Sequence, residues 1–132
     1  MTPADLAPLV LVVEDYDDAR AMYCAWLAID GCRVAEAANG RDAVERARHL
    51  APDVIVMDLS LPVMDGRAAL AALREDPRTR SVPVVVLSGD AGAATLDPAV
   101  EGWAAFVRKP CTHDGLVSAV RGILEARGRP GR

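Results

Sequence analysis

Aromatic residues and cysteines are scarce in this chain of 132 residues, and their scarcity excludes several kinds of protein. Aromatics make up only 4% of the sequence, so it has few flat side chains on which nucleic-acid bases could stack. A formal net charge of −4 also argues against a nucleic-acid partner. The three cysteines, Cys24, Cys32 and Cys111, contain no C-x-x-C pair. We therefore expect neither a zinc site nor a disulfide framework, and a reducing cytoplasm fits.

Long apolar stretches are also missing. No stretch approaches the roughly 18 uninterrupted apolar residues of a membrane helix, so we expect no membrane partner. The first ten residues lack the basic segment and long apolar core of a secretory signal. With 52% hydrophobic residues, residues 1–132 are expected to form a single domain whose core covers about residues 9–127.

Short apolar runs alternate along the chain with segments of helical periodicity. The runs Leu9–Val13 and Val54–Met57 are continuously apolar, which is typical of strands buried on both faces of a sheet. The predicted strands are 9–13, 33–37, 54–57, 82–87 and a short one within 103–107. The predicted helices are about 17–29, 41–50, 67–75 and, after an N-cap at Thr112, up to 127. Pro83 is expected at the first position of its strand, where a missing N–H is tolerated.

The alternation continues, less clearly, between the fourth and fifth strands. A helix is expected over Ala91–Glu101, but Gly92 and Pro98 interrupt the pattern. Strand and helix in alternation predict an α/β fold with a five-stranded parallel sheet and helices on both faces. In the flavodoxin-like, doubly wound version of this fold the strand order is 2-1-3-4-5, which makes the first and third strands neighbours.

Polar side chains stand where the predicted strands end. Glu14 and Asp15 follow the first strand, Asp58 the third, Ser88 the fourth and Lys109 the fifth. The carboxyl ends of parallel strands share one edge of the sheet, where ligands bind in such folds. We therefore expect all five side chains to converge if the strand order is the flavodoxin-like one.

Three carboxylates in one place repel one another unless a cation neutralises them. Oxygen ligands with no His or Cys nearby point to Mg²⁺, which commonly bridges carboxylates and phosphate oxygens. A lysine and a serine hydroxyl opposite the carboxylates complete a cradle for a phosphoryl group. An aspartate can itself be the nucleophile and form an aspartyl phosphate.

These motifs resemble those of the receiver domain of two-component response regulators, the CheY-like proteins. The resemblance covers about residues 9–126. It lies in the acidic pair Glu14-Asp15, the loop Asp58-x-x-x-Pro62-x-Met64-x-Gly66, Ser88 and the pair Lys109-Pro110. Each motif alone is weakly specific, whereas all four in this order are highly specific. One departure is that the acidic pair begins with Glu rather than Asp, which affects the metal geometry.

The resemblance implies a role for each residue on the metal side of the site. Asp58 is the expected phosphoacceptor and a ligand of Mg²⁺. Asp15 is expected to bind the ion directly and Glu14 more weakly or through water. The backbone carbonyl of Ser60 is the remaining expected ligand.

The resemblance also implies roles on the phosphoryl side. Lys109 is expected to pair with Asp58 or with the phosphoryl group, and its bond to Pro110 is expected to be cis. Ser88 is expected to bond a phosphoryl oxygen, and Phe106 matches an aromatic switch position, although an ordinary core role fits Phe106 equally well. Ser60 and Asp90 are expected to tune hydrolysis.

The resemblance implies a single-domain response regulator that takes a phosphoryl group from a histidine kinase or phosphotransfer protein and switches to control a downstream protein. It would not be an enzyme beyond its self-catalysed transfer and dephosphorylation. One alternative is a receiver cut from a larger hybrid kinase or regulator. Another is a phosphatase of the haloacid dehalogenase type, which Asp15-x-Asp17 imitates. A third is an interaction module that works without phosphorylation. His49 and His113 match no phosphotransfer motif and are expected on the surface.

Overall fold

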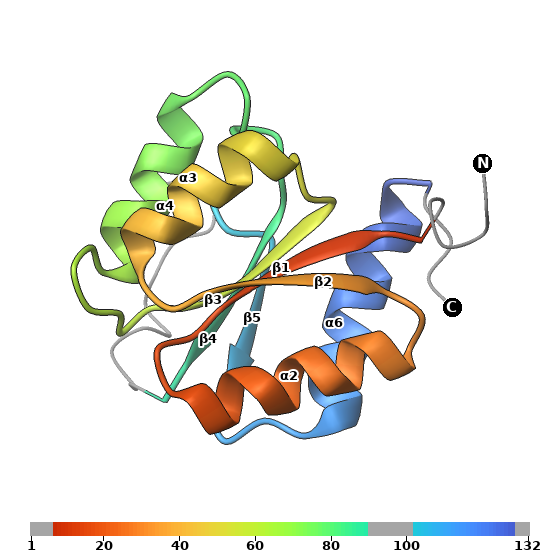
Figure 1. Ribbon diagram of the computed structural model, residues 1–132. Helices are drawn as coiled ribbons and strands as arrows, with labels where there is room; N and C mark the ends of the chain where they lie inside the picture. The colour runs from red at the N-terminus through yellow and green to blue at the C-terminus, as the bar shows by residue number, and fades with distance from the viewer. Residues whose placement is uncertain (1–6, 90–101, 129–132) are drawn as a thin grey trace.

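The computed structural model describes residues 7–89 and 102–128, and a parallel sheet of five strands lies at its centre (Figure 1). The order of the strands is β2-β1-β3-β4-β5, as the flavodoxin-like prediction required. The strands are β1 (Leu9–Val13), β2 (Arg33–Ala37), β3 (Val54–Asp58), β4 (Val84–Ser88) and β5 (Ala105–Arg108).

The apolar composition of each strand matches its place in the sheet. Every residue of the central strands β3 and β4 is buried, whereas the edge strands β2 and β5 are largely half-buried or exposed. A strand with a helix layer on each face needs apolar side chains at every position, because successive side chains point to opposite faces. The continuous runs of β-branched residues therefore form the middle of the sheet.

Helices cover both faces of the sheet (Figure 1). The helices α3 (Gly40–Leu50) and α4 (Gly66–Glu75) lie on one face, over a core that includes Leu11, Ile55 and Met57. On the other face, α2 (Asp17–Ile29) and α6 (His113–Ala126) cover a core that includes Val10 and Val56.

Side-chain caps fix the start of three of these helices. Asn39 accepts a hydrogen bond from the amide of Asp42, and Asp65 accepts one from the amide of Ala68. Thr112 accepts one from the amide of Gly115, which confirms its predicted capping role at α6. Such caps satisfy backbone N–H groups that have no partner within the helix.

The predicted start of the fourth strand is wrong. The strand begins at Val84 and not at Val82, and Pro83 precedes it. The amide of Val82 donates to the carbonyl of Thr79 in a turn, and Pro83 has no N–H with which to join the ladder. The carbonyl of Pro83 nevertheless accepts a hydrogen bond from Ile55. The expected helix at 91–101 lies outside the described residues.

The described residues bear on three further predictions. None of the helices in residues 7–89 and 102–128 combines the length and apolar character that a membrane span needs. All three cysteines lie in this part of the chain and are free, with Cys24 buried and the other two partly exposed. His49 and His113 are exposed, as predicted.

Candidate functional site

The carboxyl ends of the strands bring the predicted site residues to one edge of the sheet. Parallel pairing aligns Val13 with Met57 and Asp58 with Leu87, so the segments that follow β1 and β3 leave the sheet side by side. Lys109 follows β5, and its amide donates to the carbonyl of Ser88 at 2.9 Å. The ends of β1, β3, β4 and β5 therefore meet at this edge, as predicted for the backbone of the site.

Three carboxylates form a compact cluster at this edge. Glu14, Asp15 and Asp58 each place a carboxylate oxygen so that all three oxygens lie within 4.8 Å of one another. Glu14 is only 1% exposed and Asp58 only 6%, whereas Asp15 is exposed. Two carboxylates of the cluster, those of Glu14 and Asp58, are therefore buried, and that of Asp15 is open to solvent.

Lys109 bridges the two buried carboxylates. Its ammonium Nζ donates to Glu14 Oε1 and to Asp58 Oδ2, each at 2.7 Å. Burial acts to lower the pKa of Lys109, but the hydrogen bonds to Asp58 and Glu14 outweigh it, and the pKa is raised above its usual value. The ammonium is therefore charged throughout the physiological pH range.

Glu14 lies in a less favourable environment for a charge. Burial raises the pKa of its carboxyl group, and the hydrogen bonds from Lys109 and from the amide of Tyr16 only partly offset this effect. The amide of Tyr16 donates to Glu14 Oε2 at 3.3 Å. A further cation near Glu14 would stabilise its ionised form.

The loop after β3 holds Asp58 firmly. The amide of Ser60 donates to Asp58 Oδ1 at 2.9 Å, so both carboxylate oxygens of Asp58 accept a hydrogen bond. Gly66 returns the chain to this point, because its amide donates to the carbonyl of Leu59 at 2.9 Å. A Cβ at Gly66 would lie 2.5 Å from the carbonyl oxygen of Asp58, so the close approach requires glycine there.

The remaining predicted residues lie on or beside β4 and β5. Ser88 is the last residue of β4 and is 2% exposed. Phe106 is partly buried in β5 and packs against Trp103, with ring centroids 6.0 Å apart. This packing fits both readings of Phe106. The Lys109-Pro110 peptide is cis, as the resemblance implied. Asp90 lies outside the described residues.

Arg20 contacts the site although no sequence motif pointed to it. Its Nη1 donates to the backbone carbonyl of Glu14 at 2.9 Å, from within the first turns of α2. A basic residue near a helix N-terminus is unfavourable for the helix dipole. That local mismatch was the available signal that Arg20 has a specific partner.

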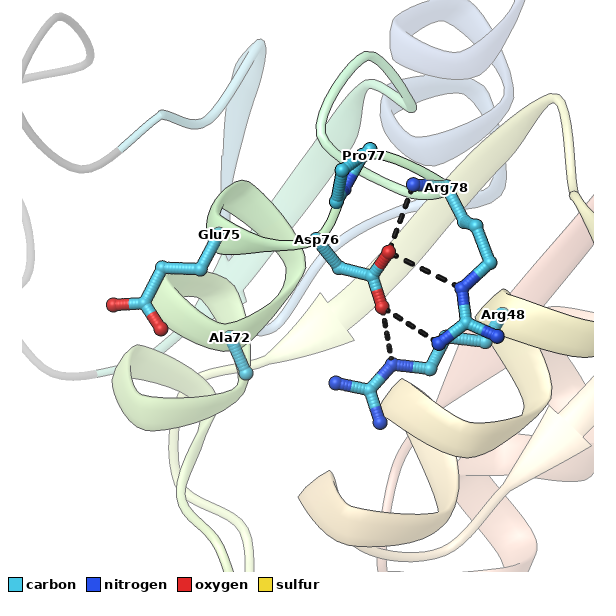
Figure 2. A pocket seen from close by; sticks show the side chains of 6 residues that line it. All are labelled: Arg48, Ala72, Glu75, Asp76, Pro77 and Arg78. Atoms are coloured by element: carbon cyan, nitrogen blue, oxygen red, sulfur yellow. Dashed lines mark hydrogen bonds and ion pairs between the residues drawn. The ribbon is translucent and has the colours of Figure 1, made fainter.

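A hollow of about 540 Å³ lies beside α3 and the end of α4 (Figure 2). Asp76, one of the residues that line it, forms ion pairs with Arg48 Nε at 2.7 Å and with Arg78 Nη2 at 2.9 Å. The hydrogen bonds from Arg78 hold the pKa of Asp76 well below its usual range. None of the predicted site residues within 7–89 and 102–128 lines this hollow, and the ion pairs tie α3 to the end of α4.

The donor set of the carboxylate cluster suits Mg²⁺. Three carboxylates within reach of one ion, with no His or Cys among them, provide the hard oxygen ligands that Mg²⁺ prefers. Glu14, Asp15 and Asp58 are the residues that would hold the ion.

Comparison with known proteins defines the class of protein that this fold and site represent. The chain matches the family model of the response regulator receiver domain over residues 10–121, and it belongs to that family. It is 36% identical to the transcriptional regulatory protein PrrA of Mycobacterium tuberculosis over 126 residues, which are 92% of this chain and 52% of PrrA. The chain thus spans about half the length of this relative.

Solved structures of receivers are similar to this chain along nearly its whole length. The chemotaxis response regulator CheY4 of Vibrio cholerae has a TM-score of 0.83 at 27% identity, covering 89% of this chain and 99% of that one. The receiver domain of the sensor histidine kinase PA1611 of Pseudomonas aeruginosa has a TM-score of 0.80 at 28% identity, covering 92% and 98%. That structure holds a magnesium ion coordinated in its active site cleft.

The alternative of a dehalogenase-type phosphatase finds no support at the site. It required Asp17 to act together with Asp15. Asp17 instead begins α2 and accepts a hydrogen bond from Arg20 Nη2 at 2.7 Å, and it is not part of the carboxylate cluster.

Proposed function

We propose that this chain is a phosphorylation-dependent receiver in which Asp58 accepts a phosphoryl group with the help of Mg²⁺. The single observation that supports this most is the placement of Asp58. Its buried carboxylate lies at the end of β3, hydrogen-bonded to Lys109 and within the cluster that contains Glu14 and Asp15. The proposed nucleophile Asp58, the ammonium of Lys109 and the carboxylates proposed to bind Mg²⁺ thus lie together at the end of β3.

The proposed transfer uses these groups as follows. A carboxylate oxygen of Asp58 attacks phosphorus while the bond from phosphorus to the donor's leaving atom breaks, and the leaving group departs with the electron pair. The three equatorial oxygens carry the negative charge of the transition state. Lys109 stabilises this charge on one side, and Mg²⁺, when bound, supplies positive charge on the other.

The ion in this proposal is held by the carboxylates of Glu14, Asp15 and Asp58 and by the backbone carbonyl of Ser60. Glu14 is longer than an aspartate and already binds Lys109, so it contributes more weakly or through water. Asp15 is exposed and is the most accessible ligand. A cation here would also relieve the unfavourable burial of Glu14.

The phosphorylated state is proposed to alter the β4–β5 side of the site. Ser88 bonds a phosphoryl oxygen, and Phe106 changes its packing as the signal passes to the output surface. Phe106 has no hydroxyl, so its two positions differ by packing alone. Amide chemical shifts with beryllofluoride, a phosphoryl mimic, should change around Phe106. Changes confined to the loops at Asp15 and Asp58 would contradict this switch.

The proposed partners are a histidine kinase or phosphotransfer protein that supplies the phosphoryl group and a downstream protein that binds the switched state. We propose that the chain works in the cytoplasm as a single-domain response regulator and not as an enzyme acting on a separate substrate. A receiver that belongs to a larger regulator or hybrid kinase would use the same site. Ser60 and Asp90 are proposed to set the lifetime of the phosphorylated form.

A mass measurement tests the proposed function. The protein is incubated with acetyl phosphate and MgCl₂, and a matched sample contains EDTA in place of the metal. Intact-mass spectrometry should show one added phosphoryl group only in the sample with Mg²⁺, and hydroxylamine should remove it. Failure to form the adduct, or equal formation in EDTA, would contradict the proposal and favour an interaction module that works without phosphorylation.

A further inference from the structure

Arg20 joins three parts of the chain at the rim of the site. Its guanidinium donates through Nη1 to the carbonyl of Glu14 at 2.9 Å, through Nε to Glu36 Oε1 at 3.0 Å and through Nη2 to Asp17 Oδ1 at 2.7 Å. The side chain is only 17% exposed. Three simultaneous bonds from one planar group restrict its position. Asp17 and Glu36 are 85% and 54% exposed, so the part-buried bond to the Glu14 carbonyl is the contact that joins Arg20 to the site.

The bond to Glu14 lies where β1 ends and the loop with the acidic pair begins. The amide of Glu14 donates to the carbonyl of Ala37 at 3.1 Å, which ties it to β2. Its carboxylate accepts hydrogen bonds from Lys109 and Tyr16. The bond from Arg20 therefore completes a set of contacts that fixes both the backbone and the side chain of Glu14. Asp15, the next residue, has no such contact of its own among the described hydrogen bonds.

We infer that Arg20 is a positioning residue for the Mg²⁺ site. Its bond to the Glu14 carbonyl orients the peptide between Glu14 and Asp15, so that Asp15 faces Asp58. Its bond to Glu36 anchors the same peptide to β2. This inference rests on the proposed function, because it assumes that the carboxylates bind Mg²⁺. Contacts to ligands from residues outside the first coordination sphere commonly contribute 10- to 100-fold to metal affinity.

Electrostatics and positioning predict opposite signs for the loss of Arg20. Removing the positive charge that contacts the Glu14 carbonyl makes the surroundings of the site more negative, and it also frees Glu36 and Asp17 from their partner. Simple Coulomb attraction would therefore raise the affinity for a cation. If Arg20 acts by positioning, its removal lowers the affinity. A fall in Mg²⁺ affinity therefore excludes a purely electrostatic role for Arg20.

The test compares Arg20→Met with Arg33→Met. Methionine keeps most of the aliphatic stem and removes the donors. Arg33 is a matched control, because its Nε also donates to a backbone carbonyl, that of Ala7 at 3.0 Å, from the same strand that carries Glu36. Ala7 precedes β1, at the opposite edge of the sheet from the carboxylates.

Lys109 offers a specific probe for the titration, because it is the only lysine in the sequence. In protein labelled with ¹³C-lysine, its ε-CH₂ group should give a single NMR signal, which reports on the ammonium between Glu14 and Asp58 as MgCl₂ is added. The apparent Kd for Mg²⁺ should rise on the order of tenfold in Arg20→Met and stay within about twofold of wild type in Arg33→Met. Thermal unfolding confirms that both variants are folded at the titration temperature.

A second readout separates positioning from a general loss of structure. With acetyl phosphate as donor, Arg20→Met should be labelled slowly at low MgCl₂ and should regain most of the wild-type rate at saturating MgCl₂. An affinity equal to or above that of wild type in Arg20→Met would overturn the inference. Wild-type protein that neither binds Mg²⁺ nor becomes labelled would instead overturn the proposed function.

Discussion

Replacing Lys109 by methionine should produce a loss of stability that depends on both pH and Mg²⁺. The ammonium contacts Glu14 and Asp58, whose side chains are 2% and 8% exposed. Lys109→Met fills a similar volume but leaves two buried carboxylates without their cation. The free energy of unfolding without metal should therefore fall clearly at neutral and alkaline pH.

The expected size follows from the burial of the three groups. Removing one partner of a buried charge pair costs about 3–5 kcal/mol, because the other partner remains buried and uncompensated. The side chain of Lys109 is itself 26% exposed, so solvent partly screens the site. We therefore expect the lower end of this range, about 3 kcal/mol at pH 8 in EDTA.

The pH dependence follows from Glu14. Its pKa is already raised by burial, and the hydrogen bond from Lys109 that lowers it is absent in the variant. A carboxyl group whose folded pKa lies above its unfolded pKa favours the folded state at low pH, and that advantage is lost as the pH rises through the folded pKa. The stability deficit of Lys109→Met should therefore shrink from pH 8 to pH 5.

Urea unfolding followed by circular dichroism measures this deficit. Wild type, Lys109→Met and the control Arg108→Met are compared in EDTA at several pH values, and again in MgCl₂. Arg108 is the adjacent cation but is exposed, so its loss should cost less than about 0.5 kcal/mol. Mg²⁺ should remove part of the deficit of Lys109→Met. A deficit below about 1 kcal/mol at pH 8, or one that does not change with pH, would refute this account of the buried cluster.

Three further changes test other features of the structure. Asp76→Asn should lower the free energy of unfolding at neutral pH and weaken its fall in acid. The lowered pKa of Asp76 stabilises the folded state above pH 3.8, the ordinary pKa of the group, and this contribution is lost as the pH falls through the folded pKa. Parallel urea titrations at pH 3 and pH 7 check this. Gly66→Ala should cost roughly 2 kcal/mol, because its Cβ would meet the carbonyl of Asp58, whereas Gly122→Ala, with open space around it, should gain up to about 1 kcal/mol; equal effects would contradict the contact. Ser60→Ala keeps the hydrogen bond from the backbone amide of residue 60 to Asp58 and removes a hydroxyl that can orient water, so it should lengthen the lifetime of the phosphorylated form. An unchanged decay rate would show that the Ser60 hydroxyl has no role in hydrolysis.

Most of the fold could be predicted from local patterns. Runs such as Val54–Met57 identify central strands, because only a strand covered on both faces needs apolar side chains at every position. The boundary at Val84 could not be predicted, because it depends on which backbone groups join the ladder with β3, and the sequence does not show those partners. Pro83 shows this directly: it accepts one hydrogen bond from β3 but lies outside β4.

The sequence predicts which residues form the site but not how their side chains contact one another. Asp58 ends its strand and Glu14 and Lys109 follow theirs, and parallel strands bring their carboxyl ends together. The bridge that Lys109 forms to both carboxylates depends on side-chain lengths across three strands. The contact of Arg20 with the Glu14 carbonyl was missed, because it depends on how α2 packs beside β1 and β2. No periodicity or motif records such a contact.

The central claim is that Asp58 is the phosphoacceptor, and mapping the phosphorylated residue tests it most directly. Wild type, Asp58→Asn and Asp65→Asn are treated with acetyl phosphate and MgCl₂ and analysed by intact mass and peptide mapping. Asp65 is a matched control, since it belongs to the same loop and caps α4, a role that asparagine also fills. We predict labelling of wild type and Asp65→Asn at Asp58 and none of Asp58→Asn. Undiminished labelling of Asp58→Asn, or mapping of the wild-type adduct to Asp15, would contradict the account.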